Sequence, residues 1–329
     1  MQKIDSAEDI QRIANIFRES RILLTAVELD VFTAISEERL SSKEIALRIL
    51  ADEKAADRLL NALTVMGLLE KSESRFSNTK TSLEYLVKGK EKYIGNLNHA
   101  AKLWESWNDL TEVVRTGEKS RVRDQKNRSG EWLESFIAAM HYRAVEQAKV
   151  IADILDLSLV EKSLDVGGGS GAFTIGFVKK NPKIRGIVFD LPNVIPLTKR
   201  YAEEAGVQGN IDFIKGDYHS DDFGNGYDLI FISAVAHINS PEENRKLISK
   251  CYEALNTGGQ IVIKDFIMNE ERIEPGFGTL FAINMLVNTE NGDAYTHNEI
   301  RSWLKENGFR EIHQKETGFG SSLMIGKKL

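Results

Sequence analysis

The sequence has little of what disulfide-bonded, zinc-binding or membrane-spanning proteins require. Its 329 residues include a single cysteine, Cys251, which excludes an intrachain disulfide and a cysteine-rich zinc site. No apolar run approaches the ~20 residues of a membrane span, and the N-terminus lacks the apolar core of a signal peptide. We therefore predict a cytoplasmic protein without a membrane partner.

Basic tails and metal-binding clusters are also missing. The formal net charge is −6, which weighs against a nucleic-acid partner. No group of His, Asp and Glu has the spacing of a metal site, so we predict metal-independent chemistry. The remaining composition is ordinary for a globular protein, with 42% hydrophobic and 28% charged residues, and the length is typical of about two domains.

Residues 1–100 are predicted to be mainly helical. Ser41 and Glu44 have the spacing of a helix N-cap and its returning acid, and helices are expected over 43–49 and 55–66. Two short strand-like pieces follow, as in a winged helix. The charges at 53–58 are balanced, whereas a DNA-recognition helix would present Arg, Lys, Asn or Gln on one face. We therefore favour a dimerisation and substrate-lid domain, with a winged-helix regulator as the alternative.

Residues 101–155 are predicted to link this domain to the next. Apolar residues recur at helical spacing from Trp104 to Val114, and a second amphipathic helix is expected from 132 to 154. The polar and basic segment 116–130 between them is expected to be a loop. We assign these residues to linking helices and to the cover of a substrate pocket.

From residue 162 onward the pattern changes to strands that alternate with helices. Such alternation is typical of a parallel, doubly wound sheet, so we predict an α/β domain of Rossmann-like fold over 156–329. A closing hairpin is expected near the end of the chain. The predicted strands are 163–166, 186–189, 211–214, 229–232 and 260–266, the helices 172–180, 194–205 and 241–255, and the hairpin strands 311–314 and 322–325.

The most informative segment is the glycine-rich turn at 164–171. Asp165 lies in an apolar strand, and Gly167, Gly169 and Gly171 follow before a helix begins. Glycine allows a tight turn and the close approach of a ligand. A new helix N-terminus offers free N–H groups. Together they predict a ligand site at the carboxyl edge of the sheet.

Two further acidic residues reduce the number of candidate ligands for this site. Asp190 ends the next strand, about 20 residues after the turn, where an acid accepts hydrogen bonds from ribose hydroxyls. Asp217 ends the third strand, where it can accept from the amine of an adenine. The dinucleotide-binding fingerprint Gly-x-Gly-x-x-Gly would have its third glycine at position 172, where this chain has alanine. Alanine is sometimes allowed there, so NAD is not excluded. Acids at three successive strand ends favour S-adenosylmethionine, and an NAD dehydrogenase is a minor alternative.

These motifs, in their order along the chain, resemble the S-adenosylmethionine-dependent O-methyltransferases of the plant caffeic-acid and bacterial hydroxyneurosporene type. The matching segments are 104–117, 164–171, 189–192, 216–217, 251–259, 285–292, 295–299 and 307–309. The resemblance implies a homodimer with a winged-helix dimerisation domain and a class I methyltransferase domain. It also implies S-adenosyl-L-methionine as methyl donor, S-adenosyl-L-homocysteine as product and a small hydroxyl-bearing aromatic or polyketide-like acceptor. The donor-binding residues are then Asp165, Gly167, Gly169, Gly171, Asp190, Leu191, Asp217, Tyr218 and Ser233.

The resemblance also places the catalytic residues. His237 follows the fourth predicted strand at the position of the family's catalytic histidine, and a neutral histidine can take the proton of a phenol, whose pKa is near 10. Asp265 matches the family's first glutamate but is one methylene shorter, which predicts a looser contact with His237. The acceptor pocket is expected to include Trp104, Met140, Phe281, Met285 and Asn288.

Two departures weaken the match in the catalytic half. Ile238 and Asn239 stand where the family has Asp-Trp after its histidine, and Ala294 stands where it has a second glutamate. Some relatives of this fold bind the same donor but carry out decarboxylation or hydroxylation. A donor-binding protein with a different or lost reaction is therefore the second hypothesis.

Overall fold

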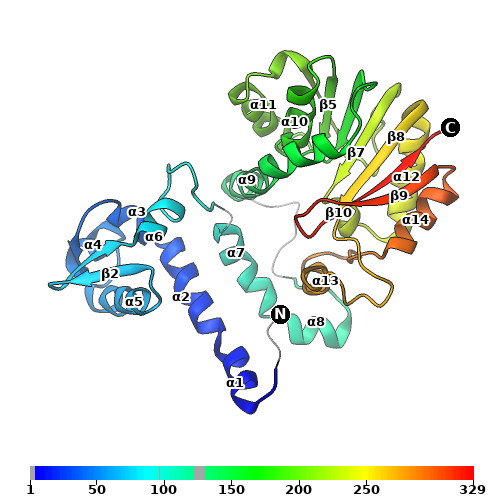
Figure 1. Cartoon of the computed structure of the whole chain (residues 1–329). Coiled ribbons are helices and arrows are strands. Elements are labelled where there is room, and N and C mark those ends of the chain that lie inside the picture. The colour runs from blue at the N-terminus through cyan, green and yellow to red at the C-terminus, as the bar shows by residue number, and fades with distance from the viewer. Residues whose placement is uncertain (1–3, 96, 122–129) are drawn as a thin grey trace. The chain divides into compact units, whose positions relative to one another are not determined.

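The computed structural model describes residues 4–95, 97–121 and 130–329, apart from the side chains at 131, 132 and 135. The chain divides into two compact units, Met1–Trp104 and Glu105–Leu329 (Figure 1). The boundary at residue 100 that we proposed from the sequence lies within α7 (Leu97–Trp107), a helix that both units share.

The first unit packs its helices around a small antiparallel sheet of order β1-β3-β2. Ser41 begins α4 with a full capping box, because its hydroxyl accepts the Glu44 N–H and the Glu44 carboxylate accepts the Ser41 N–H. Strand β1 is an addition to the predicted winged-helix order. The elements are α1 (Ala7–Asn15), α2 (Phe17–Glu28), α3 (Val31–Ile35), β1 (Leu40–Ser41), α4 (Ser42–Arg48), α5 (Glu53–Val65), β2 (Leu69–Ser72), β3 (Arg75–Asn78) and α6 (Lys80–Tyr85).

Helix α1 of this unit contributes nothing to its core. None of its residues is buried, although it is amphipathic. Ile10 is 62% exposed and Ile13 is 47% exposed, and Phe17 at the start of α2 is exposed beside them. The core is formed instead by α2 to α5 and the sheet, with Phe32, Leu60 and Phe76 fully buried.

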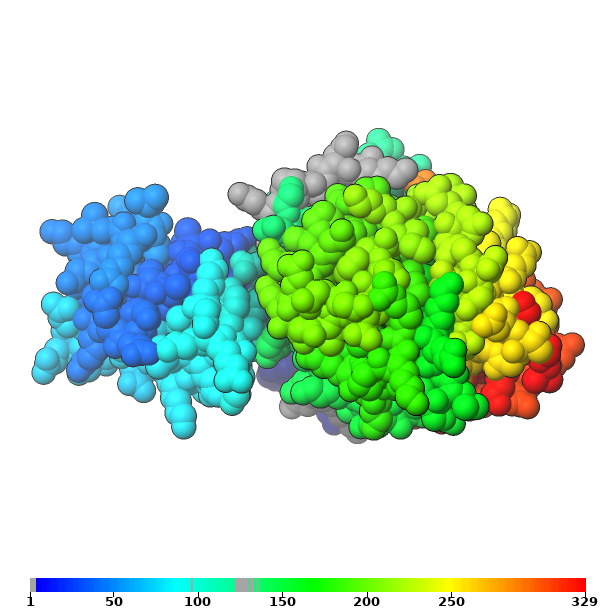
Figure 2. Space-filling view, turned by 90° about the horizontal axis from the view of Figure 1, so that it is seen from above, coloured from blue at the N-terminus to red at the C-terminus, as the bar shows by residue number. Residues whose placement is uncertain are grey.

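The second unit is built on a seven-stranded sheet of order β6-β5-β4-β7-β8-β10-β9. Strands β4 to β8 are parallel, and β10 is antiparallel to both of its neighbours. In the space-filling view, this unit, coloured green to red, forms one continuous body (Figure 2). Its strands are β4 (Lys162–Val166), β5 (Arg185–Asp190), β6 (Ile211–Lys215), β7 (Tyr227–Ser233), β8 (Leu255–Asp265), β9 (Arg310–Glu316) and β10 (Ser322–Lys327).

Helices cover both faces of this sheet, as the α/β prediction requires (Figure 1). Side chains alternate along each strand, so Leu229 and Phe231 of β7 pack beneath α9 and α10, while Ile230 and Ile232 pack beneath α12 and α14. The helices are α8 (Leu110–Thr116), α9 (Gly130–Ile154), α10 (Ala172–Lys180), α11 (Ile195–Glu204), α12 (Pro241–Ala254), α13 (Gly276–Asn288) and α14 (His297–Glu306). Within the described ranges, no helix has the length and apolarity needed to cross a bilayer.

Candidate functional site

The glycine turn lies between β4 and α10. Gly167, Gly169 and Gly171 have φ angles of 66°, 58° and 73°, which side-chain-bearing residues rarely adopt. Gly168 is required for space instead, because an added Cβ would lie 2.8 Å from both Asp165 Cγ and Val188 Cγ1. The sequence pattern did not single out Gly168, since its need arises from packing.

Helices α9 and α11 hold this turn from outside. The Thr198 hydroxyl of α11 donates to the carbonyl of Gly169 at 2.6 Å. His141 Nδ1 of α9 lies 2.9 Å from the Ser170 hydroxyl, and its ring stacks on Tyr201 of α11 with centroids 3.9 Å apart. Burial lowers the pKa of His141 to about 4, so this ring is neutral at pH 7. Sequence analysis missed His141, because one polar residue within a helix gives no pattern.

Asp190 joins the end of β5 to the turn. Its carboxylate accepts the N–H groups of Gly169 and Leu191, each at 2.7 Å. Burial raises the pKa of Asp190, and these two N–H donors act in the opposite direction. An ionised carboxylate has about four acceptor positions, so Asp190 keeps capacity for ribose hydroxyls.

Asp217 and Tyr218 follow β6 at the same edge of the sheet. Asp217 Oδ1 accepts the His219 N–H at 2.9 Å, and Asp217 is partly exposed. The Tyr218 hydroxyl donates to Asn239 Oδ1 at 2.9 Å. Asn239 stands where the family has tryptophan, and in this chain it connects the donor side to the loop after His237.

Asp165 lies on the inner side of the turn. The residue is 2% exposed, and its Oδ2 accepts the Thr174 hydroxyl at 2.9 Å. Its Oδ1 has no hydrogen-bond partner in the part of the chain that the structure describes. Burial raises the pKa of Asp165 to about 7. Its predicted contact with a donor stays a prediction.

His237 and Asp265 meet at the ends of β7 and β8. His237 Nδ1 lies 2.7 Å from Asp265 Oδ1, and the His237 N–H donates to Asp265 Oδ2 at 3.2 Å. The looser contact expected from the shorter aspartate is therefore wrong, since both carboxylate oxygens of Asp265 reach His237 within hydrogen-bond distance. Burial alone would raise the pKa of Asp265, but the charge and hydrogen bond of His237 outweigh it and hold that pKa below its ordinary value.

Backbone contacts fix the loop that carries His237. Ser233 ends β7, and Ala234 follows with a φ of 58° while its N–H donates to the carbonyl of Lys264 at 3.1 Å. Gly292 packs against this loop from the other side. A Cβ at Gly292 would lie 2.2 Å from the carbonyl oxygen of His237, so a larger residue there would displace the histidine.

An aromatic cluster lies beside His237. The Phe281 ring of α13 meets the His237 ring edge-on, with centroids 4.8 Å apart. Phe266 and Phe277 lie 4.7 Å and 6.2 Å from Phe281 between centroids. Sequence analysis found Phe281 but missed the other two, although Phe266 directly follows Asp265. Three rings beside a histidine suit a flat, apolar acceptor.

The other predicted acceptor residues have different surroundings. Met285 is buried in α13, whereas Met140 is partly buried and precedes His141 on α9. Asn288 Oδ1 accepts the Ser106 hydroxyl at 2.8 Å, so its amide supports α13. Trp104 belongs to the first unit, where the Arg21 guanidinium lies 5.6 Å from its ring centroid. Acceptor contacts of these residues stay predictions.

The edge formed by β4 to β8 fits an adenosyl amino acid. The carboxylates of Asp190 and Asp217 there have the chemistry to accept hydrogen bonds from hydroxyl and amine groups, and the glycine turn follows the neighbouring strand β4. Across 4–95, 97–121 and 130–329, no group of three or more His, Cys, Asp or Glu is arranged to hold a metal ion.

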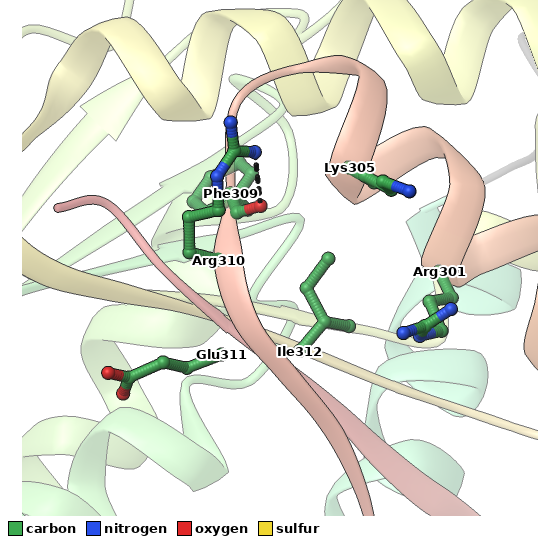
Figure 3. A pocket seen from close by; sticks show the side chains of 6 residues that line it. All are labelled: Arg301, Lys305, Phe309, Arg310, Glu311 and Ile312. Atoms are coloured by element: carbon green, nitrogen blue, oxygen red, sulfur yellow. Dashed lines mark hydrogen bonds between the residues drawn. The ribbon is translucent and has the colours of Figure 1, made fainter.

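A separate hollow of about 300 Å³ lies at the opposite edge of the sheet (Figure 3). Its lining comes from α14 and the start of β9. Arg310 of β9 pairs with Lys327 of β10, and Lys327 pairs with Gln260 in the middle of β8, away from the end that carries Asp265. The hollow is therefore remote from His237, and its lining is mostly charged. The lining residues are Arg301, Lys305, Phe309, Arg310, Glu311 and Ile312.

Two family models match the chain: an O-methyltransferase domain over 107–310 and an O-methyltransferase dimerisation domain over 11–88. A similar protein is the 3-hydroxy-5-methyl-1-naphthoate 3-O-methyltransferase of Streptomyces sahachiroi, with 31% identity over 300 residues, 89% of this chain and 87% of that protein. The tetracenomycin polyketide synthesis 8-O-methyl transferase of Streptomyces glaucescens is 28% identical over 328 residues, 97% and 96% of the two chains. The structure of human N-acetylserotonin methyltransferase in complex with SAM matches with a TM-score of 0.86 and 24% identity, over 100% and 99% of the chains.

Proposed function

The chain belongs to the family of S-adenosylmethionine-dependent O-methyltransferases, and we propose that His237 is the general base with which it methylates a hydroxyl of a small aromatic or polyketide-like molecule. The observation that carries this proposal is the 2.7 Å contact between His237 and Asp265 beside an aromatic cluster. Both of these Streptomyces relatives are named for methyl transfer to an oxygen.

The pair works through the two nitrogens of the imidazole. With Asp265 accepting the proton of Nδ1, the neutral ring keeps its lone pair on Nε2. Nε2 takes the proton of the acceptor hydroxyl, and the Asp265 carboxylate stabilises the imidazolium that forms. A positioned base of this kind contributes roughly 10²–10⁴-fold in rate.

The donor would be held along the strand ends, with Asp190 and Asp217 on its adenosine and the glycine turn against its middle. S-adenosylmethionine, when bound, supplies an electrophilic methyl group on a sulfonium. Asp190 orients its ligand because Gly169 and Leu191 fix the carboxylate. The Phe281 ring packs against the His237 ring and Phe266 packs against Phe281, so the space next to the imidazole has an apolar wall.

The second hypothesis, a donor-binding protein with another reaction, rests on Ala294. Alanine stands at the position of the family's second glutamate, so no carboxylate is present there, and the residue is buried. The His237–Asp265 pair is nevertheless complete, which favours methyl transfer.

Methyl transfer can be measured with methyl-labelled S-adenosylmethionine and a panel of phenols and hydroxynaphthoates. We expect label in the acceptor, and we expect His237→Ala to lower the rate by roughly 10²–10⁴-fold without changing the affinity for S-adenosylhomocysteine. His313→Ala, at an exposed histidine of β9, is the matched control. A His237→Ala variant that keeps the full rate would remove His237 as the base.

We further propose that the protein is a homodimer in which a second copy covers the apolar face of α1. Three features support this proposal: the match to a dimerisation domain, the absence of buried residues on α1 and the exposure of Ile10, Ile13 and Phe17. An apolar stripe of this kind is costly to leave in water.

A further inference from the structure

Lys264 is a buried lysine that the catalytic pair does not use. It precedes Asp265 on β8, so its side chain lies on the opposite face of the sheet from Asp265. The residue is only 9% exposed. Within the described residues its ammonium has no hydrogen-bond or ion-pair partner. Its Nζ lies over the Phe173 ring, 5.4 Å from the ring centroid.

A buried ammonium without an anion is unfavourable. Lysine is almost never fully buried unless it is paired, because the lost hydration of the charge exceeds what one ring face returns. Burial accordingly lowers the pKa of Lys264, and the Asp265 charge opposes that effect only in part. A ligand that brings a negative charge would remove this cost.

The position of Lys264 indicates which ligand this is. Phe173 is the second residue of α10 and comes directly after the glycine turn. Ser233, at the end of β7, is the strand partner of Lys264. The ammonium therefore lies next to the first turn of α10, at the same sheet edge as the predicted donor site.

The strand order then orients the donor along this edge. Asp217 and Asp190 follow β6 and β5, the glycine turn follows β4, and Lys264 lies on β8 beyond β7. A ligand whose adenosine lies on the two acids and which crosses the turn reaches the side of β7 and β8 with its other end. In S-adenosylmethionine that end is an amino acid with a free carboxylate.

We propose that Lys264 is the counter-charge for the carboxylate of the donor's amino-acid end. This proposal rests on the donor assigned under the proposed function, but it does not depend on His237. The contact is a charge-assisted hydrogen bond in a site largely shielded from water, and such bonds are about twice as strong as neutral ones.

Two ligands separate this role from a merely structural one. S-adenosylhomocysteine carries the amino-acid end, and 5′-methylthioadenosine lacks it. Calorimetry should show that Lys264→Met weakens binding of S-adenosylhomocysteine by about tenfold or more, while binding of 5′-methylthioadenosine stays within about twofold. Lys264→Gln, which keeps a polar side chain without the charge, should give the same pattern.

Lys199→Met is the matched control, because Lys199 is an exposed lysine of α11 whose Nζ also lies over a ring, 5.5 Å from the Phe213 centroid. It should leave both affinities unchanged. Thermal melting without ligand checks that each variant folds, and removing an unpaired buried charge should not lower the melting temperature.

Equal losses for the two ligands, or no loss for either, would overturn the proposal. If donor affinity is kept and only turnover of carboxylate-bearing acceptors falls, Lys264 serves the acceptor instead and the proposal is wrong. Failure of the proposed function has a different signature, since a chain that transfers no methyl group can still discriminate between the two ligands.

Discussion

At the scale of single residues, the site contains two buried aspartates with opposite surroundings. Asp265 has the His237 ring at 2.7 Å and a backbone donor, Phe266 N–H, and these hold its pKa low. Asp165 has one hydroxyl donor and one orphaned oxygen, and burial raises its pKa. Asp265 is therefore suited to stabilise a positive charge, whereas ionised Asp165 destabilises the fold.

Asp165→Asn should make stability less dependent on pH. The pKa of Asp165 is about 7 in the folded chain, compared with 3.8 for an ordinary aspartate, so the folded state holds the proton more tightly. Its stabilising contribution is complete below pH 4 and is lost as the pH rises from about 4 to 7. Urea unfolding at pH 5 and pH 8 should show the variant gaining roughly 2 kcal/mol relative to the unmodified chain. A difference that does not change with pH would contradict the raised pKa.

The residues that sequence analysis assigned to one edge of the sheet share a simple signal. Asp190, Asp217, His237 and Asp265 all follow or end a parallel strand, and such ends meet at one sheet edge. His141 and Phe277 were missed because helix packing, not strand order, brings them to the site. Gly168 was missed because it is required by the side chains of Asp165 and Val188 around it. Lys264 was missed because it reads as an ordinary polar residue in a strand.

At the scale of elements, the position of His237 depends on the loop after α13. Gly292 in that loop touches the carbonyl of His237 so closely that no side chain fits. The same loop carries Asp293 and the carbonyl of Ala294, both bound by Arg272. Positioning of the base is thus shared between two distant segments of the second unit.

Gly292→Ala should lower kcat by about 10²-fold, because an ångström-scale displacement of a catalytic group costs that much. Affinity for S-adenosylhomocysteine should stay within about twofold, since the donor edge lies on other strands. Steady-state kinetics and calorimetry measure the two effects. Gly209→Ala is the matched control, because an added Cβ there meets nothing within 4 Å. Unchanged kcat in Gly292→Ala would show that the loop adjusts without moving His237.

The strands of the second unit and helices α10, α11 and α12 followed from the pattern of apolar residues, and most boundaries agree within a residue or two, whereas α13 and α14 were not among the predicted helices. Strand β8 is the exception, since it begins at Leu255 and not at Gln260. Its pairing with β7 shifts between Tyr227 and Leu229, which is a bulge that accommodates Gly258 and Gly259. Glycines in such a bulge look like the end of an element in the sequence.

At the scale of the whole molecule, the two units differ in how well they bury their apolar residues. The second unit covers both faces of its sheet, whereas the first leaves every described residue of α1 unburied. Composition and helical spacing predicted a dimerisation domain, but they did not identify the face. Identifying the dimerisation face requires the exposed fraction of each residue in the folded structure.

Ile13→Lys should convert a homodimer into monomers, because a charge at the centre of an apolar interface costs more than the contact returns. Light scattering coupled to size exclusion would report the mass at micromolar concentration. Leu159→Lys, at an isolated exposed leucine of the second unit, should leave the mass unchanged. A dimer that persists in Ile13→Lys would mean that another surface joins the two copies.

The hydrogen bond between Ser106 and Asn288 also sets an order of assembly as the chain is made. The two residues lie 182 positions apart in the sequence. The Trp107 indole N–H likewise donates to Asn284 Oδ1, a residue that is synthesised much later. At about 5–20 residues per second, a ribosome completes Asn288 roughly 10–35 s after Ser106. The glycine turn and strands β4 to β6 emerge well within that interval. The strands that we propose hold the donor are therefore synthesised before helix α13, which we propose faces the acceptor.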